Sequence, residues 1–198
     1  MDNDMAAFFD RLAPNWGSAP EGYDLREKLV SMMGIHPNSV IADVGCGRGA
    51  MFEHLLKTNP MKIIAVDVSS EMLRFAKEDH RDQRIEYVNG DFLVAPLPRL
   101  DAVVLFNSYP HFMDKDALIE KLKSVIIAGG ILIIAHSMRR DKINSNHKSE
   151  GVSSLSVPLD SVEAEAAKFE DFFSSDTLFE DDEMYLLKMT RKAYDHRV

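Results

Sequence analysis

A glycine-rich string in the first third of the chain has the composition of a nucleotide-binding loop. It reads Asp-Val-Gly-Cys-Gly-Arg-Gly-Ala over residues 43–50, between an apolar run and a stretch with helical spacing. Glycines let a ligand approach the backbone, and the N–H groups that open a following helix point toward that ligand. Asp67 comes 20 residues after Gly47, where a carboxylate can bind two ribose hydroxyls. We therefore interpret this region as part of a nucleotide site rather than as a simple tight turn.

Two kinds of nucleotide are compatible with this loop. With Ala50 in the last place the string satisfies the dinucleotide pattern G-x-G-x-x-G/A, so a nicotinamide dinucleotide is one alternative. Asp43 directly precedes the glycines, and its charge would repel a pyrophosphate. Asp67 and Asp91 add two more acids at the ends of successive predicted strands. This acidic rim favours a ligand with an ammonium and a sulfonium over one with two phosphates.

Two histidines and a tyrosine are the candidates for chemistry on a second substrate. Tyr109 and His111 follow an apolar run at 101–106, and His136 ends another at 130–136. Doubly wound sheets bind their ligands at the carboxyl ends of such strands. These side chains are therefore predicted to position a substrate or to accept its proton, with loop packing as the alternative.

A basic segment, residues 139–148, follows the second of these runs. It holds four bases against one acid, a net charge of +3 with histidine counted as neutral. We predict a loop over the pocket in which Arg139, Arg140 and His147 bind a carboxylate, phosphate or phenolate, and a solvated loop is the alternative. His136 and His147 also suit a metal ion, but no third ligand is evident, and we predict no metal site.

Three further residues have a functional and a structural interpretation. Trp16 and Tyr23 lie in an N-terminal helical segment that can form a lid, in which Tyr23 would contact the substrate; helix packing is the alternative. Cys46, the single cysteine, excludes a disulfide framework and multi-cysteine metal sites. We interpret it as a small residue of the glycine loop rather than as a reactive thiol.

Five short runs rich in Val, Ile and Leu predict the strands that position these residues. Such continuous runs are typical of strands buried on both faces of a parallel sheet. Their ranges are 39–43, 62–67, 84–88, 101–106 and 130–136. Helical patterns lie between them at 50–57, from Ser69 or Ser70 onward, and from Asp114 to Gly129-Gly130, while 89–100 reads as a loop. The alternation predicts an α/β fold with a doubly wound, Rossmann-like, mostly parallel sheet.

The flanking segments complete a single predicted domain over residues 1–198. Two helices, at 5–12 and 22–33, form the lid of residues 1–35, and the cofactor-binding core spans 36–137. The remainder, 138–198, holds the substrate loop, a helix at 159–173 and two strands at 176–180 and 184–191. As an antiparallel hairpin these strands bring the predicted sheet to seven.

Composition and charge exclude several classes of function. The 198 residues hold 23 Lys+Arg and 32 Asp+Glu, a net charge of −9. Residues 160–183 hold ten acids and one base, so the remainder of the chain is neutral overall. The lack of a basic surface argues against nucleic acid, and the apolar run 125–135 is too short to span a bilayer. An acidic N-terminus is unlike a signal peptide, so we expect a cytoplasmic protein. We also expect a monomer or a homodimer.

Five strings, taken in order, resemble the class I S-adenosylmethionine-dependent methyltransferases, and most of all the small-molecule branch that includes the ubiquinone/menaquinone methyltransferases. They are DVGCGRG at 43–49, IIAVDVSSEML at 63–73, NGDF at 89–92, DAVVLFNSYPHF at 101–112 and AGGILIIAH at 128–136. The resemblance implies that S-adenosylmethionine is the cofactor. It also implies that a methyl group moves by in-line displacement to a small, possibly anionic acceptor, with release of S-adenosylhomocysteine.

The resemblance further implies which residues hold the cofactor. Asp43 would help to hold the methionine moiety, with Asn107 beside it, and Asp67 would bind the ribose hydroxyls. The remaining members of the implied cofactor set are Gly45, Cys46, Gly47, Val68, Met72 and the adenine-flanking pair Asp91 and Phe92.

The sequence also departs from the family. The string Asn-Ser-Tyr-Pro-His at 107–111 is not the N-P-P-aromatic signature of the DNA amino-methyltransferases, and the likeness fades after Ser137, so no acceptor is implied. Two alternatives stay open. One is an NAD(P)-dependent oxidoreductase, and the other is a protein that binds S-adenosylmethionine without turnover.

Overall fold

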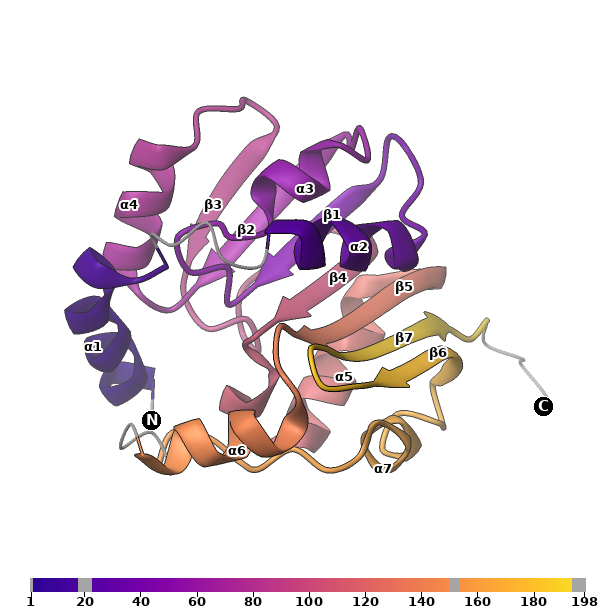
Figure 1. Ribbon diagram of the computed structural model, residues 1–198. Coiled ribbons are helices and arrows are strands. Elements are labelled where there is room, and N and C mark those ends of the chain that lie inside the picture. The colour runs from indigo at the N-terminus through magenta and orange to yellow at the C-terminus, as the bar shows by residue number, and fades with distance from the viewer. Residues whose placement is uncertain (1, 18–22, 150–153, 194–198) are drawn as a thin grey trace. The chain divides into compact units, whose positions relative to one another are not determined.

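The computed structural model describes residues 2–17, 23–149 and 154–193, which form two compact units, Met1–Leu97 and Pro98–Val198 (Figure 1). The division into a lid at 1–35, a core at 36–137 and a closing part at 138–198 stays a prediction.

The first unit is built on three parallel strands. They are β1 (Val40–Val44), β2 (Lys62–Asp67) and β3 (Ile85–Asn89), in the order β3-β2-β1. Five helical segments accompany them: α1 (Asp2–Leu12), the 3₁₀ helix η1 (Ala13–Asn15), α2 (Tyr23–Met33), α3 (Phe52–Leu56) and α4 (Ser70–Asp79). The Ser69 hydroxyl caps α4 by accepting a hydrogen bond from Met72 N, as the sequence predicted. Each of β1 and β2 carries a buried aspartate at its carboxyl end: Asp43 is the last but one residue of β1, and Asp67 is the last residue of β2.

The second unit holds four strands. β4 (Leu100–Phe106) and β5 (Ile126–His136) are parallel, β7 (Tyr185–Arg191) is antiparallel to β5, and β6 (Phe173–Glu180) is antiparallel to β7. Its helical segments are the 3₁₀ helix η2 (Tyr109–His111), α5 (Lys115–Val125), α6 (Arg140–Ser149) and α7 (Val162–Ala167). Asp114 caps α5 and Ser161 caps α7 through their side-chain oxygens.

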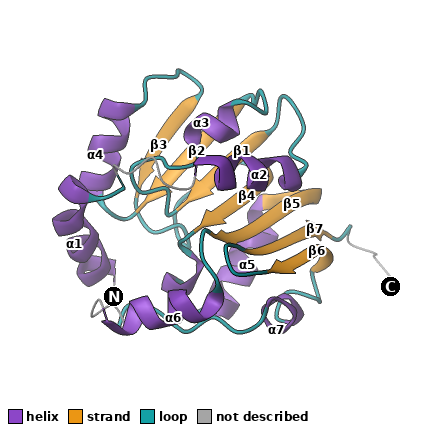
Figure 2. Ribbon diagram, viewed as in Figure 1, coloured by secondary structure: helices purple, strands orange, loops and turns teal. Residues whose placement is uncertain are grey.

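The seven strands have the order β3-β2-β1-β4-β5-β7-β6, and Figure 2 distinguishes them from the helices. This order confirms the predicted α/β fold with a mostly parallel seven-stranded sheet and an antiparallel C-terminal hairpin. The five strand predictions, the two N-terminal helices and the loop at 89–100 are also confirmed, with ends that differ by a few residues. Among the described helices, none has both the length and the apolar character needed to cross a membrane.

The prediction that a helix runs from Asp114 to Gly129-Gly130 is wrong at its C-terminal end. The helix α5 ends at Val125 and the strand β5 begins at Ile126. A Cβ atom on Gly130 would lie 2.7 Å from Ile126 Cγ2 and 3.0 Å from the Asp101 carbonyl oxygen. Gly129 has a φ of +77°, and the register of β4 and β5 shifts between Leu100 and Ala102. These glycines therefore allow an irregular, closely packed strand instead of ending a helix.

Two other element predictions need correction. The basic segment 139–148 is mostly helical, in α6, and not a loop. Its run of polar residues contains a single apolar residue, the buried Ile143, so the sequence lacks the apolar stripe that usually indicates a helix. The helix predicted at 159–173 is shorter: α7 ends at Ala167, and β6 already begins at Phe173.

Candidate functional site

Asp67 holds the glycine loop in place. One carboxylate oxygen, Oδ2, accepts a hydrogen bond of 2.8 Å from Gly47 N, and the other, Oδ1, accepts one of 2.9 Å from Ser69 N. Gly45 and Gly47 have φ angles of +69° and +53°, the left-handed region that suits glycine. The spaced acid that the sequence singled out therefore contacts the loop directly, and it connects the loop to the start of α4.

Asp43 is the most unusual polar group of the first unit. Its side chain is 1% exposed, and its Oδ2 atom has no hydrogen-bond partner among the described residues. Burial, and then the charge of Asp67, raise the pKa of Asp43 to about 7. A buried carboxylate oxygen without a donor costs about 1–3 kcal/mol, so this position fits a ligand that brings a hydrogen-bond donor or a positive charge.

The other residues of the predicted cofactor set differ in exposure. Met72 and Phe92 are buried. The Met72 side chain lies beside the glycine loop, since a Cβ atom placed on Gly47 would be 4.0 Å from Met72 Sδ. Val68 and Asp91 are half-buried, and Asp91 Oδ1 accepts a hydrogen bond from Leu93 N. The first unit thus brings the glycine loop, Asp43, Asp67 and Met72 together at the carboxyl ends of β1 and β2.

Cys46 is buried in the glycine loop, and burial, followed by the charges of Asp67 and Asp43, raises the pKa of its thiol. A protonated buried thiol is a poor nucleophile, which fits the interpretation of Cys46 as a small loop residue.

The segment before β1 contributes an aromatic side chain to the loop. The Trp16 ring lies beside Gly47, since a Cβ atom placed on that glycine would be 3.4 Å from Trp16 Nε1. Trp16 is 41% exposed, and its ring contacts the Phe9 ring edge-to-face. Asp10 in α1 accepts hydrogen bonds from Ser69 Oγ at 2.6 Å and from Glu71 N at 3.0 Å. The helix α1 is therefore attached to the start of α4, and Trp16 lies beside the glycine loop. The side chain of Tyr23, the other predicted lid aromatic, lies outside the described residues.

Sequence reasoning missed Asp10 and Arg48 as the residues that attach this segment. Arg48 donates a hydrogen bond to the Ala13 carbonyl oxygen and pairs with Asp79 at 2.6 Å. Asp10 gave no local signal, because its partners lie 59 and 61 residues away. Arg48 is part of the glycine string itself, and its charge in a loop of small residues was the available signal.

The second unit brings three predicted histidines together in what we name the histidine cluster: His111, His136 and His147. The rings of His111 and His147 have centroids 5.2 Å apart. His136 is 2% exposed, its ring meets Tyr185 edge-to-face, and its Nε2 atom has no hydrogen-bond partner among the described residues. Burial lowers the pKa of His136 to about 3 and that of His111 to about 4, so both imidazoles are neutral at pH 7.

Asn107 joins the carboxyl ends of β4 and β5. Its Oδ1 accepts a hydrogen bond of 3.0 Å from Ser137 N, and its Nδ2 donates to Ser137 Oγ at 3.1 Å. The residue has a φ of +56°, which is uncommon outside glycine and tolerated by asparagine. Its implied place beside the methionine part of a cofactor stays a prediction.

Tyr109 is packed into the core of the second unit, where its hydroxyl has a protein partner. It is fully buried, its hydroxyl donates a hydrogen bond of 2.6 Å to Glu165 Oε2, and burial raises its pKa far above the ordinary value. The Tyr109 hydroxyl thus has a partner inside the protein, and the role of Tyr109 in positioning a substrate stays a prediction.

Lys115 and Glu165 complete this buried network, and sequence reasoning missed both. Lys115 Nζ donates to the Tyr109 carbonyl oxygen at 2.7 Å and lies 3.5 Å from the centroid of the Tyr109 ring. Glu165 is 1% exposed and pairs with Lys168 at 3.0 Å. Glu165 belongs to the acid-rich segment and was counted there as surface charge, although the alanines at 164, 166 and 167 around it were a signal of a packed helix.

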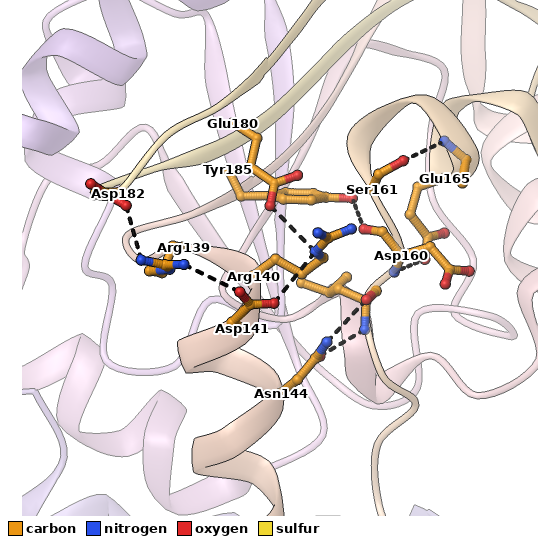
Figure 3. Close-up of polar contacts among 12 residues, drawn as sticks. Arg139, Arg140, Asp141, Asn144, Asp160, Ser161, Glu165, Glu180, Asp182 and Tyr185 are labelled. Carbon is orange, nitrogen blue, oxygen red and sulfur yellow. Dashed lines mark hydrogen bonds and ion pairs between the residues drawn. The ribbon is translucent and has the colours of Figure 1, made fainter.

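The two arginines predicted to bind the substrate are engaged in ion pairs at the start of α6 (Figure 3). Arg139 pairs with Asp182 at 3.0 Å and with Asp141 at 3.2 Å. Arg140 pairs with Glu180 at 3.3 Å. The structure thus gives these guanidinium groups protein carboxylates as partners, which favours a role in holding the β6–β7 turn against α6.

Metal ligation by His136 and His147 was the alternative. Among the described residues, no three His, Cys, Asp or Glu side chains form a group that could hold a metal ion.

Comparisons with known proteins find a family model that matches the central part of the chain. Residues 42–134 match the family described as a methyltransferase domain. Phosphoethanolamine N-methyltransferase 1 of Arabidopsis thaliana is 23% identical over 178 residues, which cover 88% of this chain and 36% of that protein. The chain therefore spans about a third of the length of that relative.

Two solved structures show the same fold at low sequence identity. A chain of the complex that contains the Haloferax volcanii Trm112 methyltransferase activator has a TM-score of 0.79 and 16% identity, covering 93% of this chain and 98% of that one. The N-methyltransferase NodS from Bradyrhizobium japonicum, in complex with S-adenosylhomocysteine, has a TM-score of 0.72 and 15% identity, covering 95% and 98%. With its glycine loop, its spaced Asp67 and its match over residues 42–134, the chain is similar to methyltransferase domains and shares the fold of these solved structures.

Proposed function

We propose that the protein transfers a methyl group from S-adenosylmethionine to a small-molecule acceptor by in-line displacement. The observation that carries the proposal is the buried Oδ2 of Asp43, which has no donor among the described residues and fits the ammonium group of an amino acid. When bound, S-adenosylmethionine supplies a methyl group on a positively charged sulfur and leaves as S-adenosylhomocysteine.

The residues of the first unit bind and orient the cofactor in this proposal. Asp67 accepts hydrogen bonds from the ribose hydroxyls with the lone pairs that its bonds to Gly47 N and Ser69 N leave available. Asp91 and Phe92 flank the adenine, and Trp16 covers the glycine loop and excludes water. A displacement at carbon depends chiefly on alignment, so positioning of this kind is the main catalytic contribution expected of the protein.

A small acceptor is supported by the relative from Arabidopsis thaliana, whose name gives phosphoethanolamine as its substrate. The formal charge of −9 and the ion pairs of Arg139 and Arg140 argue against nucleic acid as the acceptor.

Calorimetric titration tests this proposal against its alternatives. Purified protein is titrated separately with S-adenosylmethionine, S-adenosylhomocysteine and NADH, and the first two are expected to bind at one site while NADH is not. Asp43→Asn, which keeps the shape but removes the charge, should weaken both methionine-derived ligands. Binding of NADH alone would favour the oxidoreductase alternative. Binding of S-adenosylmethionine with no S-adenosylhomocysteine formed from any acceptor tested would favour a protein without turnover.

A further inference from the structure

The dipeptide Asn89–Gly90 follows the sequence pattern at which asparagine most readily loses its side-chain amide. Glycine has no side chain to shield its backbone nitrogen, so that nitrogen can attack the side-chain carbonyl carbon of the asparagine before it. It is the one Asn-Gly pair in the sequence. Asn89 is therefore a candidate site of spontaneous deamidation.

Asn89 lies at a place where the first unit is easy to open. It is the last residue of β3, which stands at the end of the strand order and pairs with β2, and it is exposed. Strand ends at the edge of a sheet open at a much lower free energy than the whole domain unfolds. Water and base therefore reach the Asn89 side chain after a local opening that leaves the core intact.

Three hydrogen bonds hold the reacting groups in place while β3 stays paired with β2. Asn89 Nδ2 donates to the carbonyl oxygens of Asp67 and Val68, each at 3.1 Å, and Gly90 N donates to the same Asp67 carbonyl oxygen at 3.0 Å. Both carbonyl oxygens can only accept, so the side-chain nitrogen of Asn89, and not its oxygen, faces them. The attacking nitrogen is thus directed at Asp67, and the reaction requires these bonds to break first.

We propose that Asn89 is a site of spontaneous deamidation, and that this modification disables the cofactor site around Asp67. The Gly90 backbone nitrogen gives up its proton and bonds to the side-chain carbonyl carbon of Asn89, and the side-chain nitrogen leaves as ammonia. Water then opens the resulting succinimide at either carbonyl carbon, which gives aspartate or isoaspartate. In sum, an amide and a water molecule are consumed, and a carboxylate and an ammonium ion are formed.

The product does not fit the contacts that the amide makes. A carboxylate at position 89 has no hydrogen to donate, so it either repels the Asp67 and Val68 carbonyl oxygens or turns away and leaves them without this donor. Isoaspartate also adds a methylene group to the backbone just before Asp91 and Phe92. The carboxyl end of β2 therefore loses support at the residue that holds the glycine loop. The effect on the cofactor rests on the proposed function, whereas the chemistry at Asn89 does not.

Controlled ageing of the full chain tests the modification. The protein is held at pH 8.5 in buffer, in buffer with S-adenosylhomocysteine, and in urea that unfolds it, while peptide mass spectrometry measures aspartate and isoaspartate at Asn89. We expect the reaction to be fastest in urea and slowest with the ligand. At 100 times its Kd the ligand should slow the reaction by up to about 100-fold, because the opening must first release it. Asn38, which is exposed and followed by serine, is the internal control and should react more slowly than Asn89 in urea.

A variant separates the effect of the product from the rate at which it forms. Asn89→Asp reproduces the aspartate product and should weaken S-adenosylhomocysteine about tenfold or more, as expected for lost hydrogen bonds. Asn38→Asp makes the same change at an exposed asparagine before β1 and should bind as the wild type does. Calorimetric titration measures both affinities.

The possible outcomes distinguish this inference from the proposed function. The inference is overturned if Asn89 stays intact in buffer while Asn38 of the same sample reacts, or if Asn89→Asp binds the ligand normally. A rate that bound ligand leaves unchanged would overturn the link between Asn89 and the cofactor site. If the wild type does not bind S-adenosylhomocysteine, the proposed function fails, while the rates in buffer and in urea still test the site at Asn89. The ageing of the wild type decides even if Asn89→Asp does not fold.

Discussion

Asp67 uses its two carboxylate oxygens for two separate parts of the first unit. One oxygen accepts from the glycine loop at Gly47 and the other from the start of α4 at Ser69. Each oxygen keeps a second lone pair, so a ribose hydroxyl can be added without breaking either bond. The same residue therefore shapes the loop and is available to the cofactor.

We predict that Asp67→Asn weakens S-adenosylhomocysteine about 10- to 100-fold, because the variant loses one acceptor oxygen and the charge that strengthens the bonds. Calorimetric titration measures the affinity. Glu86→Gln, an exposed carboxylate on β3 that pairs with Lys62, is the control and should bind normally. An unchanged affinity in Asp67→Asn would mean that the ribose lies elsewhere.

Asp43 should couple cofactor binding to proton release. Without ligand its pKa is raised to about 7, and an ammonium group beside it would lower that pKa again. We predict that binding of S-adenosylhomocysteine releases close to one proton at pH 6 and almost none at pH 8.5, with tighter binding as the pH rises between them. Titrations in two buffers of different ionisation enthalpy measure the released proton. Asp43→Asn should abolish the release, and a release that persists would assign it to another group.

At the scale of elements, the attachment of α1 to α4 depends on one carboxylate. Asp10 accepts from Ser69 Oγ and Glu71 N, at the N-terminus of α4, where a negative charge is also favourable. The neighbouring Trp16 is the single tryptophan of the chain, so its fluorescence reports on this segment alone.

We predict that Asp10→Ala exposes Trp16 further, shifting its emission to longer wavelength, and weakens S-adenosylhomocysteine several-fold. Fluorescence titration of the variant and the wild type gives both quantities. Asp4→Ala, an exposed residue of the same helix, should behave as the wild type. If the two variants gave the same spectrum and affinity, α1 would not act as a lid.

Most elements were predictable because their signals are local. Continuous apolar runs predicted the parallel strands, and the residues that end those strands predicted Asp67 and the histidines. The buried network of Tyr109, Lys115 and Glu165 was not predictable, because the Tyr109–Glu165 contact spans 56 residues. The ion pair of Arg139 with Asp182 spans 43 residues, so a segment that looks freely basic in the sequence is neutralised by a distant turn.

Gly130 shows how a local signal can mislead. A glycine pair after an amphipathic helix usually marks the helix end. Here the absence of a side chain lets Gly130 lie close to the Ile126 side chain and the Asp101 carbonyl oxygen. We predict that Gly130→Ala lowers the free energy of unfolding by about 1–3 kcal/mol through overpacking. Urea denaturation followed by circular dichroism measures it, with the exposed Ala128→Ser as control. A stability equal to that of the wild type would show that the neighbours can give way.

At the scale of the whole molecule, the charge of −9 is confined to residues 160–183, around α7, β6 and the turn before β7. Part of it is neutralised by Arg139 and Arg140, which lie outside this segment. Asp43, His111 and His136, whose buried side chains have strongly shifted pKa values, lie outside this segment, at or beside the carboxyl ends of the strands. The dependence of stability on pH should therefore follow these buried groups rather than the acidic surface.

The two buried histidines should dominate the acid side of that dependence. Their pKa values are about 3 and 4 in the folded protein and about 6.5 when unfolded, so below pH 6.5 the unfolded chain binds more protons. Each histidine thus contributes stability that is present above pH 6.5 and is lost as the pH falls toward its folded pKa. Asp43, with a folded pKa of about 7, acts in the opposite direction and loses stability as the pH rises from 4 to 7.

We predict that the two histidines outweigh Asp43 and Asp67, whose pKa is also raised by burial, so the free energy of unfolding rises from pH 4 to pH 6.5. His136→Gln should flatten this rise, because the variant lacks a histidine that stays neutral in the folded protein and binds a proton only when the chain unfolds. Asp43→Asn should steepen it, since the opposing contribution is gone. Urea denaturation at intervals of half a pH unit measures all three proteins. A slope that His136→Gln leaves unchanged would mean that His136 is not held neutral in the folded protein.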